Sequence, residues 1–263
     1  MTSIWGIVNV TPDSFSDGGA HYAADDAIAH GRLLREGGAT VLDVGGESTR
    51  PGAEPVGAEI EIARILPVIR TLAADRATVS VDTYRAATAE AAIDAGAAIV
   101  NDVSGGLADP AILDVVAERG VDIALGHWRG PSSDMYAQAT YTHIGREVAD
   151  ELSARAEAAI AAGVARERVI LDPGIGFAKR GEQNWALLRE LDAIVGLGYR
   201  VLVGTSRKGF LASALGEETT IERRDLATAV TSVLAVQAGA WGVRVHDAAA
   251  TRDALAVARE WKG

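Results

Sequence analysis

Short apolar runs alternate with longer segments of helical periodicity along almost the whole chain. The runs are rich in valine, isoleucine and leucine, which is typical of strands buried on both faces of a parallel sheet. Glycine or polar residues bound most of them. Eight strands are expected: Ile4–Val8, Thr40–Val44, Thr78–Asp82, Ala98–Asn101, Asp122–Leu125, Val169–Asp172, Arg200–Val203 and Gly242–Val245.

The segments between the runs are rich in alanine and repeat their apolar residues with the period of an α-helix. Glycines are expected to end several of these helices in the left-handed conformation, namely Gly37, Gly96, Gly120, Gly163 and Gly239. The helices expected from the pattern are Ala24–Glu36, Ile60–Leu72, Ala86–Asp94, Ala111–Glu118, Ile144–Ala162 and Leu226–Ala238.

Eight strand–helix units in 263 residues favour a TIM (β/α)8 barrel of the α/β class. The main competitor is a doubly wound open sheet with fewer strands. Because no linker interrupts the alternation, residues 1–263 are expected to form a single domain. The longest irregular segments, residues 11–22, 45–55 and 128–142, follow the first, second and fifth strands. In a barrel all three lie at the carboxyl ends of the strands, where catalytic loops gather.

The composition narrows the class of partner. Acidic residues number 36 against 25 basic ones, and the net charge of −11 would repel polyanions at long range. Nucleic acid and membranes are therefore not expected as partners. No cysteine is present, which excludes disulfides and thiolate metal sites. The sequence shows no signal-like start and no long uncharged apolar run, so a cytoplasmic location is expected.

Polar residues stand at or just after the end of each expected strand. Alone, such a residue is more often a helix cap or a satisfied buried group than a catalyst. A polar residue after every one of eight parallel strands instead predicts a site at the carboxyl end of the barrel. These residues are Asn9, Asp43, Asp82, Asn101, His127, Asp172, Ser206, Lys208, Arg244 and His246.

The residue types fall into two groups with different chemistry. The acids Asp82 and Asp172, with the amide of Asn101, suit a heterocycle with adjacent donors and acceptors, such as an aminopyrimidinone. The second group is cationic and rich in donors, and suits a phosphate or diphosphate. Asn9 offers a neutral oxygen to Mg²⁺, a cation that takes other ligands from phosphate and water. The cationic group consists of Arg207, Lys208, Arg244 and His246.

The motifs around these residues resemble those of the dihydropteroate synthases, in order and over almost the whole chain. The resemblance implies a TIM barrel, usually dimeric, that condenses 6-hydroxymethyl-7,8-dihydropterin diphosphate with 4-aminobenzoate to give 7,8-dihydropteroate and pyrophosphate. The motifs are GIVNVTPDSFSDGG (6–19), DVGGESTRPGA (43–53), SVDTYR (80–85), NDVSGG (101–106), DPGIGFAK (172–179), GTSRKGFL (204–211) and RVHD (244–247).

The same resemblance implies a role for each matching position. Asp82, Asn101, Asp172 and Lys208 match the family's pterin pocket. Asn9, Arg244 and His246 match its diphosphate and magnesium site. The aminobenzoate site would be shaped by Thr49, Arg50, Pro51, Phe177, Ser206 and Lys208.

Chemically, a diphosphate attached through a methylene to an electron-rich pterin favours ionisation first and capture by the aniline nitrogen second. The catalytic groups expected to stabilise this charge separation are Asp82, Asp172, Lys208, Arg244 and His246.

Two alternative functions keep the pterin groups. One is a non-catalytic pterin-binding paralogue, and the other is a methyltetrahydrofolate-binding barrel of the methyltransferase type. Neither has a use for the STRPGA (48–53), SRK (206–208) and RVHD segments together, because their ligands carry no diphosphate.

Several other positions receive a non-catalytic interpretation or stay open. Asp43 either contacts ligand or anchors the glycine loop behind it, and His127 is expected to pack or cap. Gly126 stands where the family commonly has methionine, so a roomier pocket is expected there. The remaining charges are interpreted as solvated helix faces, namely Glu59 and Glu61 with Arg64, and Glu147 and Glu151 with Arg155.

Overall fold

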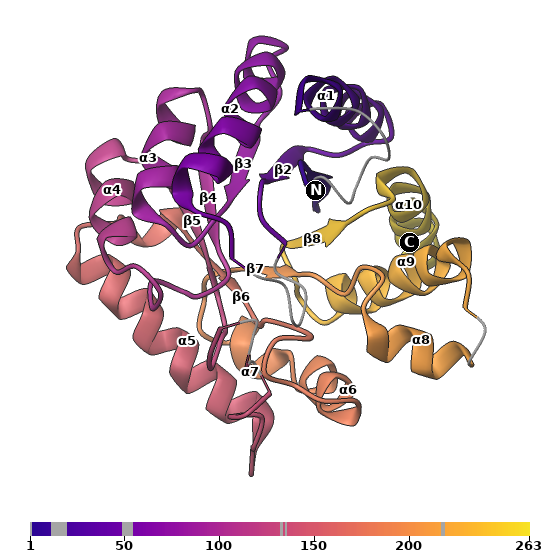
Figure 1. Cartoon of the computed structure of the whole chain (residues 1–263). Coiled ribbons are helices and arrows are strands. Elements are labelled where there is room, and N and C mark those ends of the chain that lie inside the picture. The colour runs from indigo at the N-terminus through magenta and orange to yellow at the C-terminus, as the bar shows by residue number, and fades with distance from the viewer. Residues whose placement is uncertain (1, 12–19, 49–54, 132–133, 135, 217–218) are drawn as a thin grey trace.

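The computed structural model describes residues 2–11, 20–48, 55–131, 134, 136–216 and 219–263. Eight parallel strands close into a barrel in sequence order, with β1 pairing both β2 and β8 (Figure 1). The predicted TIM barrel is confirmed, and each predicted strand is found to within one residue at either end. The strands are β1 Ser3–Asn9, β2 Val41–Gly45, β3 Val79–Asp82, β4 Ile99–Asp102, β5 Asp122–Gly126, β6 Val169–Asp172, β7 Arg200–Val203 and β8 Gly242–Val245.

Helices surround the strands, and the six predicted helices are all present (Figure 1). Three of the four that the pattern missed, α6, α7 and α8, are too short for a periodicity to be recognised. The fourth, α10, is a full-length amphipathic helix that packs against α1 and α9 and completes the ring. The helices are α1 Ala20–Glu36, α2 Ala58–Ala74, α3 Ala86–Asp94, α4 Ala111–Arg119, α5 Ile144–Ala161, α6 Glu182–Arg189, α7 Asp192–Val195, α8 Gly209–Leu215, α9 Ile221–Gln237 and α10 Ala248–Lys262.

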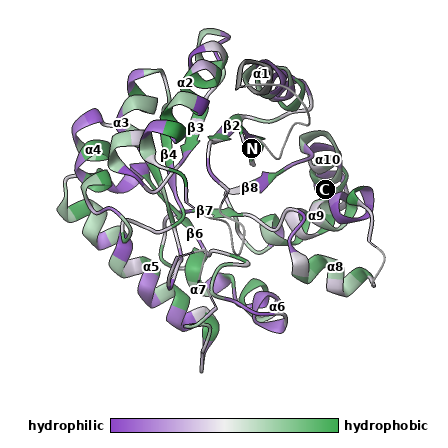
Figure 2. Ribbon diagram, in the orientation of Figure 1, coloured by the Kyte–Doolittle hydropathy of each residue, from purple (hydrophilic) through white to green (hydrophobic). Residues whose placement is uncertain are grey.

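Hydrophobic and hydrophilic residues alternate along the helices, as expected for helices that cover a barrel (Figure 2). Helices α4, α5 and α9 are followed by the predicted left-handed glycines, as is α3 at Gly96. After α1 the prediction was wrong by one residue, because Gly38 rather than Gly37 has the positive φ, 109°. None of the described helices is long and apolar enough to cross a membrane.

Apolar side chains form two separate cores. The larger one lies between strands and helices. The smaller one takes one residue from each of six strands, which can meet only inside the barrel. Since side chains alternate along a strand, the residue two positions further on faces the same interior, one layer nearer the carboxyl end. The inner core consists of Trp5, Val41, Ile99, Ala124, Ile170 and Leu202.

Candidate active site at the carboxyl ends of the strands

A polar layer lies directly above the inner apolar core. Counting two residues on from Val41, Ile99 and Ile170 gives Asp43, Asn101 and Asp172. The same count from Ala124 and Leu202 reaches Gly126 and Gly204, which add no side chain at this level. The strand period therefore explains why acids and amides converge above the inner core while glycines leave room between them.

Arg244 joins the groups of four strands in the Arg244 cluster, which we define as Arg244, Asp43, Asp82 and Asn101. Its Nε donates to Asp43 Oδ2 at 2.5 Å, and its Nη2 donates to Asp82 Oδ2 at 2.6 Å. Asn101 Nδ2 donates to the same Asp43 oxygen at 3.0 Å. The Asp43 side chain is fully buried in this cluster.

The expected acidic and cationic groups meet at Arg244. Its guanidinium neutralises two carboxylates instead of standing apart from them. Burial raises the pKa of Asp82 to about 7, the Arg244 charge opposes that shift, and the Asp43 carboxylate adds to it. The pKa of Arg244 is raised by the same two carboxylates, against the effect of burial.

Two carboxylate oxygens of the cluster have no hydrogen-bond partner within the described residues. They are Asp43 Oδ1 and Asp82 Oδ1, and both are buried. A buried acceptor without a donor is costly, so such atoms are rare unless a ligand satisfies them. The two oxygens could therefore accept hydrogen bonds from a ligand.

Asp172 and Lys208 form the opposite wall of the polar layer. Gly174 N donates to Asp172 Oδ1 at 2.7 Å, and Lys208 Nζ donates to the carbonyl of Ile175 in the same turn. The Lys208 ammonium also lies 5.0 Å from the centre of the Phe177 ring. Burial lowers the pKa of Lys208 to about 8 although the Asp172 carboxylate opposes it, and burial raises the pKa of Asp172.

The remaining predicted residues lie in three settings. Ser206 Oγ and His246 Nδ1 are 2.8 Å apart, so β7 and β8 present them together. Arg207 instead donates from Nε and Nη2 to Asp225 of α9, both at 2.7 Å, which places it in an ion pair apart from the Arg244 cluster. Asn9 ends β1 beside Gly45 of β2. Thr49, Arg50 and Pro51 lie outside the described residues.

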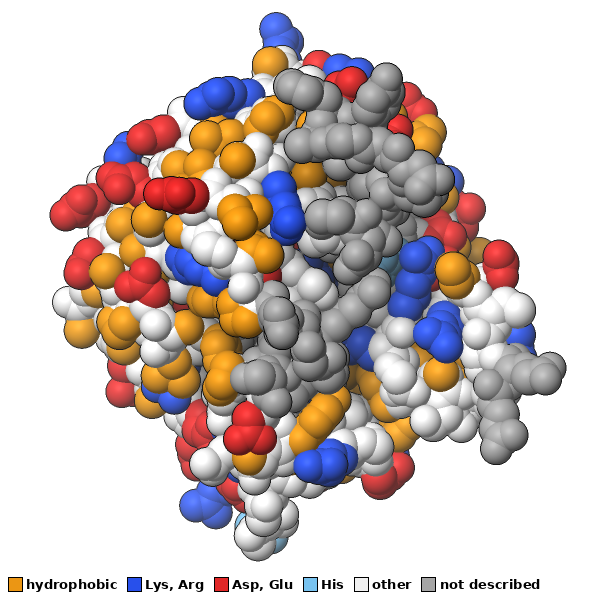
Figure 3. Space-filling model, in the orientation of Figure 1, with side chains coloured by type: hydrophobic (Ala, Val, Ile, Leu, Met, Phe, Trp, Pro, Cys, Tyr) orange, Lys and Arg blue, Asp and Glu red, His pale blue; other side chains and the backbone are white. Residues whose placement is uncertain are grey.

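A cavity of about 200 Å³ lies among the loops that follow β2 to β6. Tyr84 and Trp128 form one aromatic wall, with ring centres 6.0 Å apart, and Phe177 lines the same space. Charged side chains of both signs are interspersed around this face of the molecule (Figure 3). An apolar cavity beside a few convergent polar groups is the usual form of a small-molecule site.

The expectation of a roomier pocket at Gly126 is not met. A Cβ placed there would meet backbone atoms of Val103 at 2.6 to 2.8 Å, so the backbone of the loop after β4 already fills that space. Gly105 fits reciprocally, because its own Cβ would lie 2.7 Å from the carbonyl oxygen of Gly126. The glycine allows the loops after β4 and β5 to pack backbone against backbone.

Three glutamates that the sequence analysis assigned to solvated helix faces instead form hydrogen-bonded ion pairs with other elements. Glu61 is 1% exposed and accepts from Arg85 Nη1 and Thr88 Oγ1, both at 2.8 Å. Glu147 and Glu151 both pair with Arg129. Helical spacing of charges suggested i,i+4 pairs, and the partners that these side chains take come from α3 and from the loops after β3 and β5, which spacing does not reveal.

His127 packs rather than lining the cavity, and its partner is a residue that the sequence reading did not single out. Lys179 Nζ lies 2.9 Å from His127 Nδ1, and the Lys179 side chain is almost completely buried. A lysine closing a glycine-rich turn just after an aspartate was a signal available in the sequence, but lysine is so often exposed that the burial was not expected.

Comparison with known proteins places these features in one family. The family model described as pterin binding enzyme matches residues 5–246. A dihydropteroate synthase from Mycobacterium leprae is 50% identical over 97% of this chain and 92% of its own length. Dihydropteroate synthase from Xanthomonas albilineans, solved with 4-aminobenzoic acid, superposes with a TM-score of 0.93 at 43% identity, covering 100% of this chain and 93% of that one. The same enzyme in complex with 7,8-dihydropteroate gives a TM-score of 0.89 at 41% identity, over 100% and 94% of the two chains.

Proposed function

The chain belongs to the pterin binding enzyme family, within its dihydropteroate synthase group, and from this premise we propose the reaction that it performs. It condenses 6-hydroxymethyl-7,8-dihydropterin diphosphate with 4-aminobenzoate to give 7,8-dihydropteroate and pyrophosphate, a transferase step of folate biosynthesis. The observation that carries the proposal is the pair of buried acceptor oxygens in the Arg244 cluster, which faces Asp172 and Lys208.

We assign the pterin ring to this polar layer. Asp82 and Asp172 accept N–H groups of the ring, and Asn101 and Lys208 contact its polar edge. As the bond to the diphosphate breaks, positive charge develops on the pterin methylene, and the two carboxylates favour it. Negative charge develops on the departing pyrophosphate, next to the cations at the ends of β7 and β8.

The remaining assignments concern the diphosphate of the pterin substrate and the aminobenzoate. His246 and Arg244 bind the pyrophosphate, and Arg207 supports it if its pair with Asp225 opens. Phe177 and Ser206 border the aminobenzoate, whose amino nitrogen attacks the methylene carbon and then loses a proton, with the pyrophosphate as the acceptor. Thr49, Arg50 and Pro51, which follow β2 in the sequence, are also proposed to shape the aminobenzoate site.

Mg²⁺ is proposed at the diphosphate, with Asn9 as its protein ligand. Among the described residues, no group of three or more His, Asp, Glu or Cys side chains could hold a metal ion. A single amide oxygen at the end of β1 therefore fits a cation that takes its other ligands from phosphate and water, as Mg²⁺ does. When bound, the ion would neutralise charge on the leaving group.

We also propose that two copies of the chain form a homodimer through α9 and α10. Leu226, Val230 and Leu234 are 51% to 65% exposed and recur every four residues on α9, while Val257 and Trp261 do so on α10 at 70% and 88%. Such stripes on adjacent helices favour a self-complementary interface. Light scattering is expected to give twice the chain mass of 27.3 kDa for the wild type and the single mass for Leu234→Glu. Ile60→Glu on α2, where the side chain is 51% exposed against 55% for Leu234, serves as the control. A monomeric wild type contradicts the dimer.

All 263 residues are proposed to act as one domain, since β1 and β8 from the two ends of the chain pair with each other. The cytoplasmic location stays a prediction.

A pyrophosphate-release assay tests the proposed reaction. Purified protein is mixed with the pterin diphosphate and magnesium, with 4-aminobenzoate added or withheld, and dihydropteroate is measured alongside pyrophosphate. Release of both products only in the complete mixture is expected. Binding of the pterin without any release would instead favour the non-catalytic paralogue.

A further inference from the structure

Lys179 is a buried cation that the proposed chemistry does not use. Its side chain follows the Asp172 turn and is 1% exposed. The ammonium nitrogen lies 3.0 Å from the carbonyl oxygen of Gly174, 2.9 Å from that of Phe177 and 2.9 Å from His127 Nδ1. No carboxylate is in contact with it within the described residues, which is unusual for a buried lysine.

The direction of these hydrogen bonds follows from the far side of the imidazole. His127 Nε2 lies 3.0 Å from Glu151 Oε2, and the pKa of Glu151 is lowered to about 2 by its bonds to His127 and Arg129, which outweigh burial. An ionised carboxylate only accepts, so Nε2 carries the proton and Nδ1 is an acceptor. The Lys179 nitrogen thus faces three acceptors, and satisfying them takes the three N–H bonds of an ammonium. Burial lowers the pKa of Lys179 well below its usual value, the charges of Lys208 and Arg129 add to that effect, and the carboxylates of Asp172 and Glu151 oppose it. Each of the three acceptors favours the charged form, because it takes an N–H of the ammonium.

The ammonium holds the turn that shapes the polar layer. Gly174 donates its N–H to Asp172 and accepts from Lys179 through its carbonyl, so the backbone of one residue links the two side chains. Phe177, whose ring lines the cavity, is tied to the same nitrogen through its carbonyl. The turn is tight, since a Cβ on Gly174 would lie 2.1 Å from the carbonyl oxygen of His127.

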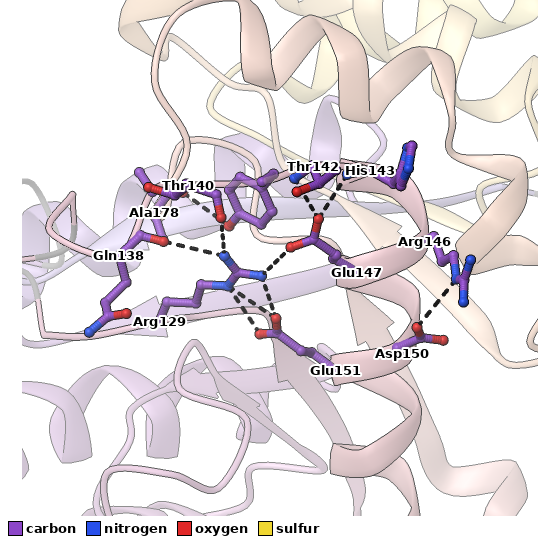
Figure 4. A network of polar contacts seen from close by, with 12 residues as sticks. Arg129, Gln138, Thr140, Thr142, His143, Arg146, Glu147, Asp150, Glu151 and Ala178 are labelled. Atoms are coloured by element: carbon purple, nitrogen blue, oxygen red, sulfur yellow. Dashed lines mark hydrogen bonds and ion pairs between the residues drawn. The ribbon is translucent and has the colours of Figure 1, made fainter.

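Glu151 also connects this arrangement to the loop after β5. Arg129 donates to Glu151 and Glu147 on α5 and to the carbonyls of Gln138 and Thr140 in the loop, as Figure 4 shows. The same loop reaches the Asp172 turn through Tyr141, whose hydroxyl donates to Ala178. The Lys179 cluster, defined as Lys179, His127, Glu151 and Arg129, thus lies behind the pocket and is anchored on α5.

We propose that Lys179 is a positioning residue for pterin binding: its ammonium, held by the His127–Glu151 pair, fixes the turn 174–177 and with it the Asp172 carboxylate and the Phe177 ring. This inference rests on the proposed function. It adds a role for Lys179, His127 and Glu151, none of which contacts the substrate in the proposed function.

The test measures binding without turnover. The affinity for 7,8-dihydropteroate is determined by calorimetry at a temperature where circular dichroism shows every variant fully folded. Lys179→Met is expected to weaken binding about 30-fold, the effect of losing a charge-assisted hydrogen bond at a site that must be preorganised. Glu151→Gln, at a side chain that is one-third exposed and tolerant of change, is expected to weaken it about fivefold.

Glu147→Gln is the matched control, because it removes the other carboxylate of Arg129 from the same helix and leaves His127 untouched. It is expected to bind within about twofold of the wild type. A second readout is the ¹⁵N spectrum of the His127 ring, which is expected to show the proton on Nε2 in the wild type and a mixture of tautomers in Glu151→Gln.

The outcomes separate the two proposals. A wild-type protein that does not bind dihydropteroate contradicts the proposed function. A wild type that binds, with Lys179→Met and Glu151→Gln binding equally well, overturns only the positioning role. A wild-type His127 protonated on Nδ1 does the same, because Lys179 would then accept rather than donate. If Lys179→Met does not fold, Glu151→Gln and the spectrum decide.

Discussion

The Arg244 cluster and the Lys179 cluster both place charge near Asp172, yet they differ in how completely their polar atoms are used. In the Arg244 cluster two buried carboxylate oxygens have no donor within the described residues. In the Lys179 cluster the ammonium has three acceptors and both imidazole nitrogens are paired. An unused buried acceptor costs free energy that a ligand can recover, whereas a fully paired network is rigid and gains nothing from a ligand. The contrast separates atoms that bind from atoms that hold the binding atoms in place.

The strongest test of the contrast is Asp172→Asn. Asparagine keeps an oxygen for the N–H of Gly174 but removes the charge that faces Lys208 and the developing cation. We expect kcat/KM for the pterin diphosphate to fall about 10³-fold, with little change in Tm. Steady-state kinetics and thermal unfolding measure the two effects.

The matched control is Asp122→Asn, which changes a carboxylate paired with Arg168 and Arg200 at the amino end of β5, the opposite end of the barrel. Its kcat/KM should stay within about twofold of the wild type. Near-normal turnover in Asp172→Asn would show that Asp172 takes no part in the chemistry. The proposed difference between substrate-binding groups and supporting groups would then lack functional support.

The second test uses pH, because the pKa values of two groups in the polar layer, Asp82 and Lys208, lie near neutrality. Asp82, with a pKa of about 7, loses its acceptor charge below that pH, and Lys208, with a pKa of about 8, loses its ammonium above it. Affinity for dihydropteroate is therefore expected to peak between these values and to fall by up to about tenfold per pH unit on each side. Calorimetry from pH 5 to 9 measures it.

Stability should move in the opposite direction over the acid part of that range. The folded protein keeps the Asp82 proton up to a pH of about 7, whereas the unfolded chain releases it near 3.8, so this contribution to stability is lost as pH rises from about 4 to 7. Asp82→Asn is expected to abolish both the acid limb of binding and this loss. An unchanged acid limb in that variant would assign the titration to another group.

The sequence was sufficient for the barrel because its signals are local. Each strand is a short apolar run, and the period of two within Ile99 to Asn101 or Ile170 to Asp172 already determines which side chains face inward. The convergence of the polar strand ends follows from the closed order of the strands. These features need no knowledge of tertiary partners.

Partner choice could not be predicted in the same way. The sequence did not show that Arg244 donates to Asp43 and Asp82, which are more than 160 positions away in the chain. Glu151 looked like any exposed helical acid until the loop after β5 brought Arg129 and His127 to it. Gly126 suggested space, because a sequence does not show that the Val103 backbone approaches.

Gly126 directly precedes His127 of the Lys179 cluster and pairs with Asp172 of β6. Gly126→Ala tests whether the backbone contact of Gly126 matters. The added methyl group must displace the Val103 backbone, which cannot move as a flexible side chain does. We expect a loss of about 2 to 3 kcal/mol in the free energy of unfolding, measured with urea. Gly57→Ala, where a Cβ would meet nothing within 4 Å, is the control. An equally stable Gly126→Ala would show that the loop after β4 relaxes freely.

The smallest expected effect is that of a change at Glu61. This residue belongs to a third polar network, which should support the fold without binding ligand. The Glu61 carboxylate is buried, its Oε2 accepts from Arg85 and Thr88, and neither of its oxygens is a buried atom without a partner among the described residues. Arg85 has a second partner in Glu47. Glu61→Gln keeps the shape of the side chain and one acceptor oxygen. Arg85 loses its ion pair with residue 61 but retains the one with Glu47. We expect a loss of about 1 to 2 kcal/mol in the free energy of unfolding. Dihydropteroate affinity should stay within about twofold, because no unused acceptor is removed. Urea unfolding and calorimetry on the same preparation measure both quantities. A variant that unfolds normally but binds poorly would mean that a fully paired network can itself contact ligand, and complete pairing would no longer distinguish scaffold from site.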